Sequence, residues 1–292
     1  MATTKKKKVN RIALVIDDSG SMGSLRQNLV NAFNANVNTI VKNARKTRQR
    51  TGVSLYMFGD RVDRRYTNET VGAVEKLTLA TYLAQGGGTP LYDAVGKAIQ
   101  DLQATPVGID EDVSNLVIVM TDGGENASKN FNASSLRQAI AAVQRTDRWT
   151  FAFSVPMGTR YLISGQLGIP DGNIQEWEQT ARGMETYAAS NSAGVSSFYG
   201  ARSKGLTNST TFYTNLSGVK ATNVKKILTD LTLEVRVLKV EREERIREFV
   251  ELKTKSPLLK GAAFYQLTKS EKKVQKGKQI LVMEKGKNAI YG

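Results

Sequence analysis

The feature that most constrains the fold of this chain is a series of short, almost continuous apolar segments separated by helical patterns. Four of these segments have the length of strands but no polar alternation, as is typical of strands buried on both faces of a sheet. They occupy residues 11–16, 53–58, 116–120 and 149–155. Because helical spacing of apolar side chains fills the intervals, we predict an α/β fold for residues 9–204: a doubly wound, mostly parallel sheet flanked by helices.

Helical periodicity is clearest over residues 24–47, where apolar side chains recur every three or four positions. The remaining expected elements of this domain are helices at 91–102, 135–143 and 188–204, a polar edge strand at 64–67, a short strand at 174–177 and loops over 158–173. Residues 1–8 are expected to be a basic, disordered N-terminus.

The composition changes after residue 204. Residues 205–222 are rich in Thr, Asn, Ser and Gly, which indicates a linker or a long loop. From residue 205 onward the chain has 18 Lys+Arg and 9 Asp+Glu, so this segment carries +9 of the net charge of +15. Alternating apolar residues at 231–237 and an apolar run at 278–283 predict a small, basic, mainly β or α+β module over 223–292, in which the stretch 241–251 suits a helix or a strand equally.

Composition and missing motifs exclude many enzyme classes. The sequence has no Cys and no His, which removes disulfides, thiol nucleophiles, zinc sites built on these residues and histidine acid–base catalysis. It also has no Walker-type G-x-x-x-x-G-K-[ST] segment and no G-x-S-x-G elbow. We therefore expect a protein that is not an enzyme. No apolar run approaches the roughly 18–20 residues that span a bilayer, so we expect no membrane span and a cytoplasmic location, in the host cytoplasm if the source is viral.

Oxygen-bearing side chains follow two of the apolar segments. Asp17, Ser19 and Ser21 come directly after the first one, two residues apart. Thr89 follows three glycines, and Asp122 follows the third apolar segment. Loops at the carboxyl ends of parallel strands converge on the crevice where α/β proteins bind ligands. Two carboxylates and three hydroxyls suit a small dication that keeps some water, so we predict Mg²⁺, with Mn²⁺ or Ca²⁺ as alternatives.

The pattern Asp17-x-Ser19-x-Ser21, with Thr89 in Gly-Gly-Thr-Pro and Asp122 in Thr-Asp-Gly, resembles the von Willebrand factor A domain and its metal-ion-dependent adhesion site. The resemblance covers the whole predicted sheet domain and implies a Rossmann-like fold. It implies that the Ser and Thr hydroxyls contact the metal, whereas the two aspartates bind mostly through water and hydroxyl groups. It further implies an open coordination position, which an acidic side chain of a partner protein fills.

Four other polar residues are expected to support this site or to line its rim: Asp18, Asp93, Glu125 and Asn126. Asp18 and Asp93 suit capping groups that hold the ligands in place, whereas a solvated surface is an equally good interpretation for Glu125 and Asn126. In the C-terminal module, the candidates for contact with a polyanion are Lys269, Lys272, Lys273, Lys276 and Lys278. The alternative for these lysines is a solvated face.

Three functions follow from these observations. The leading hypothesis is an adaptor or scaffold that binds an acidic residue of a partner protein through Mg²⁺, as intracellular proteins of the family that this chain resembles often do. The second is a nucleic-acid-binding protein that uses the basic C-terminal module, with the first domain as a docking or regulatory platform. The third is a metal-dependent hydrolase. The composition suits a bacterial or phage source, and the oligomeric state cannot be derived from the sequence.

Overall fold

The computed structural model describes residues 6–214, 233–242, 245–254, 263–266 and 290–291. The chain divides into two compact units, Met1–Gly218 and Val219–Gly292. Within the described ranges, no helix is long and apolar enough to cross a membrane.

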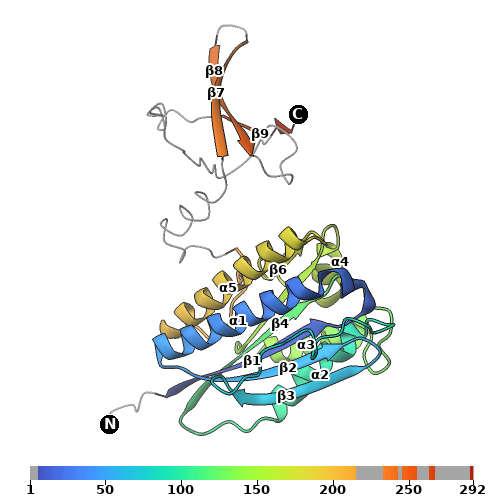
Figure 1. The fold of residues 1–292 in the computed structure, drawn as a ribbon. Coiled ribbons are helices and arrows are strands. Elements are labelled where there is room, and N and C mark those ends of the chain that lie inside the picture. Colours follow the sequence, from blue (N-terminus) through green and yellow to red (C-terminus); the bar gives the residue numbers. More distant parts are fainter. Residues whose placement is uncertain (1–5, 215–232, 243–244, 255–262, 267–289, 292) are drawn as a thin grey trace, which may run out of the picture. The chain divides into compact units, whose positions relative to one another are not determined.

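The described part of the first unit is built on a six-stranded sheet with the order β3-β2-β1-β4-β5-β6 (Figure 1). Its strands are β1 (Lys7–Asp17), β2 (Arg50–Phe58), β3 (Val62–Thr70), β4 (Glu111–Met120), β5 (Trp149–Pro156) and β6 (Ile174–Trp177). Every pairing is parallel except that of β3 with β2, which is antiparallel. The predicted doubly wound, mostly parallel sheet is thus confirmed, and β3 is its polar edge.

Helices cover both faces of the sheet (Figure 1). On one face lie α1 (Arg26–Thr47) and α5 (Ala181–Ser203), side by side. On the other lie α2 (Leu91–Ala104), α3 (Ala133–Gln144) and α4 (Arg160–Leu167). Alternate residues of β1 serve the two cores, since Ile12 and Leu14 pack toward α1 and α5, whereas Ala13 and Val15 pack toward α2 and α3. This two-sided burial explains why the strands show no polar alternation.

Three helices differ from the sequence expectation. Helix α5, expected at 188–204, already begins at Ala181. The long helix begins at Arg26, because a 3-10 helix, η1 (Gly20–Leu25), occupies the preceding turn. The region 158–173, expected to be loops, contains α4 and a short 3-10 helix, η2 (Asp171–Asn173). Ile163 and Leu167 bury α4 against the sheet, and Gly168, with φ of 71°, ends it in the left-handed conformation that glycine adopts easily. Glycine here marks the end of a helix rather than its absence.

The first unit continues past α5. Residues 205–214 are irregular, yet Phe212 and Tyr213 are buried in the core beneath α5. The Phe212 ring lies so close to Gly194 of α5 that a Cβ atom there would come within 2.4 Å of it. The backbone nitrogen of Phe212 also donates to Asn173 Oδ1 at 2.8 Å. This segment therefore belongs to the packed domain.

The described part of the second unit is an antiparallel sheet with the order β10-β9-β8-β7. Its strands are β7 (Leu233–Arg242), β8 (Arg245–Thr254), β9 (Ala263–Gln266) and β10 (Ile290–Tyr291). The stretch 241–251, for which the sequence suited a helix and a strand equally, lies mostly in β8. The apolar run at 278–283 and the candidate polyanion contacts Lys269, Lys272, Lys273, Lys276 and Lys278 lie outside the described residues.

Candidate metal centre

Asp17 is the last residue of β1, and its carboxylate is completely buried. Its Oδ1 accepts a hydrogen bond from the Ser19 backbone nitrogen at 2.9 Å, and its Oδ2 accepts one from Thr121 Oγ1 at 2.5 Å. The hydroxyl of Tyr82, itself buried, donates to the Asp17 carbonyl at 2.7 Å. The carboxylate is therefore fixed between the loop that follows β1 and the loop that follows β4.

Hydroxyl groups connect these two loops. Ser19 Oγ lies 3.0 Å from Ser21 Oγ, and Ser21 Oγ donates to Asp122 Oδ1 at 2.9 Å. Asp17, Ser19, Ser21 and Asp122 thus form one continuous hydrogen-bonded set at the carboxyl ends of β1 and β4, in which Asp17 is joined through the Ser19 backbone nitrogen. Asp122 is about as buried as Ser19, at 6% and 4% exposed.

Thr89 brings a third hydroxyl toward the same loops. Its backbone nitrogen donates to Asn126 Oδ1 at 2.7 Å, and its carbonyl accepts from the Asn126 backbone nitrogen at 3.3 Å. Its Oγ1 lies 3.7 Å from where a Cβ atom of Gly123 would stand. In the part of the chain that the structure describes, this hydroxyl has no hydrogen-bond partner. Together these five residues, Asp17, Ser19, Ser21, Thr89 and Asp122, are called the metal cluster below.

Backbone contacts hold the loop before Thr89 against the loop after β1. Gly86 forms a parallel bridge with Ser19, and its carbonyl accepts from the Gly20 nitrogen at 2.8 Å. Gly86 also approaches Gly59, at the end of β2, so closely that a Cβ atom on it would stand 2.5 Å from the Gly59 Cα. Only glycine fits there, which explains part of the glycine run. Asp18 contributes its Oδ1, which accepts from the Ala84 nitrogen at 2.6 Å.

Two other acidic residues shape the loop after β4. Glu125 accepts hydrogen bonds from the backbone nitrogens of Tyr92, Ala127 and Ser128 at 2.7–2.8 Å. Asp93 accepts from three successive backbone nitrogens, those of residues 129–131, at 2.8–2.9 Å. Both carboxylates thus bind the loop to the start of α2. Asp18, Asp93, Glu125 and Asn126 all contact backbone near the metal cluster, so each one positions a loop.

The electrostatics of the cluster favour a cation. Burial raises the pKa of Asp17, and the charge of Asp122 raises it further, whereas hydrogen bonds from Ser19 and Thr121 lower it. Burial also raises the pKa of Asp122. Among the described residues, neither carboxylate forms an ion pair with Lys or Arg. Two buried carboxylates without a protein counter-charge are costly in free energy, and a dication held by their neighbouring hydroxyls would remove that cost. The donor set therefore fits a hard metal ion.

The sequence pattern of the von Willebrand factor type A domain matches residues 12–192. The chain belongs to this family. Domains of this family mediate protein interactions and commonly bind a divalent metal at the metal-ion-dependent adhesion site. No curated protein matches the chain.

Several solved structures resemble the chain at low identity. Proximal thread matrix protein 1 from the mussel byssus, with a zinc-occupied metal-ion-dependent adhesion site, is 15% identical, with a TM-score of 0.41, over 63% of this chain and 44% of that one. VWA2, the ArnB paralog from Sulfolobus acidocaldarius, is 12% identical, with a TM-score of 0.40, over 66% and 46%. The pilus adhesin SpaC from Lactobacillus rhamnosus GG is 14% identical, with a TM-score of 0.47, over 67% and 32%. This chain thus spans less than half of each of these proteins.

Four residues of the von Willebrand factor type A domain support the metal cluster without having been singled out from the sequence. They are Tyr82 and Thr121, which bind Asp17, and Trp177 and Gln179, whose side chains donate to the carbonyls of Thr121 and Asp122. Thr121 precedes Asp122 directly, so its position offered a signal. The others come from distant segments, and only the folded chain brings them to the cluster.

Proposed function

We propose that this protein is a metal-dependent adaptor that binds an acidic side chain of a partner protein. The observation that carries the proposal is the metal cluster itself, in which two buried carboxylates that form no ion pair with another described residue are linked through Ser19 and Ser21. The Thr89 hydroxyl, which has no hydrogen-bond partner among the described residues, lies beside the loop that follows β4. This arrangement supplies oxygen ligands and negative charge at the end of a rigid sheet.

We propose Mg²⁺ as the resident ion, with Mn²⁺ or Ca²⁺ as alternatives. All the donor atoms are hard oxygens, and small dications bound by one or two carboxylates keep several waters. Ser19, Ser21 and Thr89 would hold the ion through their hydroxyls. Asp17 and Asp122 would orient those hydroxyls and balance the charge. The bound ion would offer a positive position to a carboxylate from outside.

The proposed action is binding without catalysis. The metal cluster has no histidine or cysteine, because the chain contains neither. Its two carboxylates accept hydrogen bonds from Ser19, Thr121 and Ser21, so they are engaged in holding the loops. Assays for phosphatase and nuclease turnover with Mg²⁺ and Mn²⁺ test this part of the proposal, and turnover that Asp122→Ala abolishes would overturn it.

The adaptor function is tested by affinity capture from a lysate of the source cell. The intact protein, Asp122→Ala and the control Glu185→Ala are each used with Mg²⁺ and with EDTA. Glu185 is an exposed carboxylate on α5, so its removal changes the net charge equally. We expect one protein to be recovered by the intact and control baits with Mg²⁺ only. Recovery that is unchanged by EDTA and by Asp122→Ala would refute metal-mediated binding.

A further inference from the structure

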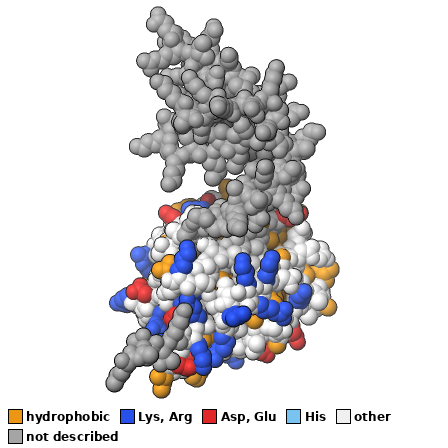
Figure 2. Space-filling view, turned by 90° about the vertical axis from the view of Figure 1, so that its left-hand side faces the viewer, with side chains coloured by type: hydrophobic (Ala, Val, Ile, Leu, Met, Phe, Trp, Pro, Cys, Tyr) orange, Lys and Arg blue, Asp and Glu red, His pale blue; other side chains and the backbone are white. Residues whose placement is uncertain are grey.

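The C-terminal half of α1 is strongly basic and contains no compensating acid. Between residues 19 and 59 the sequence has no Asp or Glu. Lys42, Arg45, Lys46 and Arg48 lie at the end of α1, and all four are exposed. Figure 2 shows Lys and Arg side chains gathered on one face of the first unit, with few acidic side chains among them.

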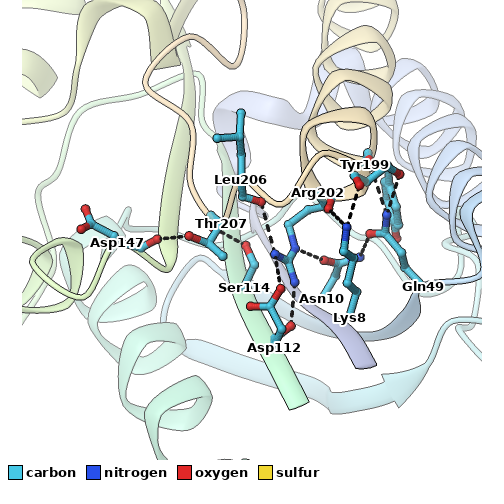
Figure 3. Close-up of polar contacts among 11 residues, drawn as sticks. Lys8, Asn10, Gln49, Asp112, Ser114, Asp147, Tyr199, Arg202, Leu206 and Thr207 are labelled. Carbon is cyan, nitrogen blue, oxygen red and sulfur yellow. Dashed lines mark hydrogen bonds and ion pairs between the residues drawn. The ribbon is translucent and has the colours of Figure 1, made fainter. Parts of the chain in front are cut away.

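A second helix ends beside these cations. The side chain of Gln49 donates to Ser203 Oγ at 3.1 Å and to the Tyr199 carbonyl at 3.2 Å, so the ends of α1 and α5 are joined directly (Figure 3). Lys204, which follows Ser203, is exposed as well. The five exposed cations at these joined helix ends, Lys42, Arg45, Lys46, Arg48 and Lys204, are called the basic end below.

Nearby acidic residues already have other partners. Asp110 pairs with Lys7 at 2.8 Å, and Glu111 pairs with Arg50. Asp112 pairs with the buried Arg202 at 3.0 Å, as Figure 3 shows. None of the five cations of the basic end forms an ion pair with another described residue. Helix C-termini favour one or two cations through the helix dipole, but five uncompensated charges exceed what that effect explains.

We propose that the basic end binds the phosphate backbone of a nucleic acid. Arginine forms paired hydrogen bonds with phosphate, and both residue types release counterions from a nucleic acid when they bind it. Of the exposed large apolar side chains of the described residues, none lies between 42 and 50 and only Leu206 lies near Lys204. The stretch that carries four of the five cations therefore has no large apolar side chain to insert into a lipid bilayer.

The basic end is separate from the metal cluster. It lies at the amino ends of the parallel strands, where Gln49 precedes β2, whereas the metal cluster lies at their carboxyl ends, where Asp17 ends β1. One domain would thus carry a site for protein at one end and a site for nucleic acid at the other. The inference does not depend on the metal, so it can be tested with the metal removed.

The test uses the full chain in EDTA, with a fluorescein-labelled, mixed-sequence RNA of about 30 nucleotides and a DNA duplex of the same length. Fluorescence anisotropy gives the affinity between about 50 and 200 mM salt. The patch variant carries Arg45→Gln, Lys46→Gln and Lys204→Gln. The control carries Arg61→Gln, Lys76→Gln and Lys129→Gln, which removes the same charge from exposed residues that form no ion pair with another described residue. Thermal melting of both variants verifies that they fold.

We expect the patch variant to bind at least about tenfold more weakly at the lowest salt, with a slope of log K against log salt that is smaller by about 2–3. The control should lose much less affinity. Equal losses in the two variants would overturn the proposal, as would no measurable binding by the intact chain. Binding only to vesicles that contain an anionic lipid, tested in parallel, would assign the surface to a membrane and would also overturn it.

Discussion

Ser21 Oγ and Asp122 Oδ1 lie 2.9 Å apart, although 101 positions separate the two residues in the sequence. This hydrogen bond joins the loop after β1 to the loop after β4, and it lies within the proposed metal cluster. The bond therefore fixes the Asp122 carboxylate relative to Ser21, one of the proposed ligands.

Removing the Ser21 hydroxyl should weaken metal binding without unfolding the domain. We expect Ser21→Ala to lower the affinity for Mg²⁺ by about 10–100-fold, because the variant loses both a ligand and the group that orients Asp122. Isothermal titration calorimetry measures this directly. Ser24→Ala is the matched control, since Ser24 is exposed in the same 3-10 helix and makes no hydrogen bond through its side chain within the described residues. Equal affinities of the two variants would exclude Ser21 as a ligand.

Metal binding should stabilise the folded state. A ligand at about 100 times its dissociation constant adds about 2.7 kcal/mol to the free energy of unfolding. For a domain of this size, we expect Mg²⁺ to raise the melting temperature of the intact protein by roughly 5–10 °C. Differential scanning fluorimetry with Mg²⁺ and with EDTA measures the shift. Ser19→Ala should show little of it, and a full shift in that variant would place the ion elsewhere.

In the metal-free protein, the Asp122 carboxylate should reduce stability at neutral pH. Burial raises its pKa, so its contribution to stability is fully present below the ordinary Asp pKa of about 3.9 and is lost as pH rises through the raised pKa. In EDTA at pH 7, Asp122→Asn should therefore melt at a higher temperature than the intact protein. The difference between the two melting temperatures should shrink as the pH approaches about 4. A lower melting temperature for Asp122→Asn at pH 7 would contradict this account.

Replacing Arg202 should destabilise the first unit strongly. Its guanidinium is fully buried and donates to the Asn10 side chain, to the side chain and carbonyl of Asp112, and to the Leu206 carbonyl at 2.6–3.2 Å. Arg202→Met leaves the buried acceptors and the Asp112 charge unpaired, so we expect a loss of about 3–5 kcal/mol. Urea denaturation measures it, with the exposed Arg148→Met as control. If both variants unfolded at the same urea concentration, the buried network would contribute nothing.

Much of the fold was predictable from the sequence because buried parallel strands leave a local signal. The four apolar segments correspond to β1, β2, β4 and β5, and the short strand expected at 174–177 is β6. Helix α4 was missed because its segment contains Gly165 and ends at Gly168, so the apolar pair Ile163 and Leu167 stood out too little. Burial of that pair against the sheet, which depends on the tertiary fold, stabilises the helix.

The metal cluster was also predictable from the sequence, whereas some of the residues that support it were not. Asp17, Ser19 and Ser21 are close in sequence, and Asp122 and Thr89 could be placed from the ends of predicted strands or from a glycine run. Tyr82 and Gln179 could not, because neither has a local pattern that distinguishes it from an ordinary core or surface residue. They reach the cluster through loops whose conformations depend on long-range packing.

The packing of residues 205–214 bears on how the domain can be isolated. The family pattern ends at residue 192, in the middle of α5. A shortened protein that stopped there would lack Arg202, Phe212 and Tyr213, which complete one core and one buried network. Crystallising the first unit alone, or fusing it to another protein, therefore requires the chain through residue 214. The family pattern ends before the segment that completes the folded domain.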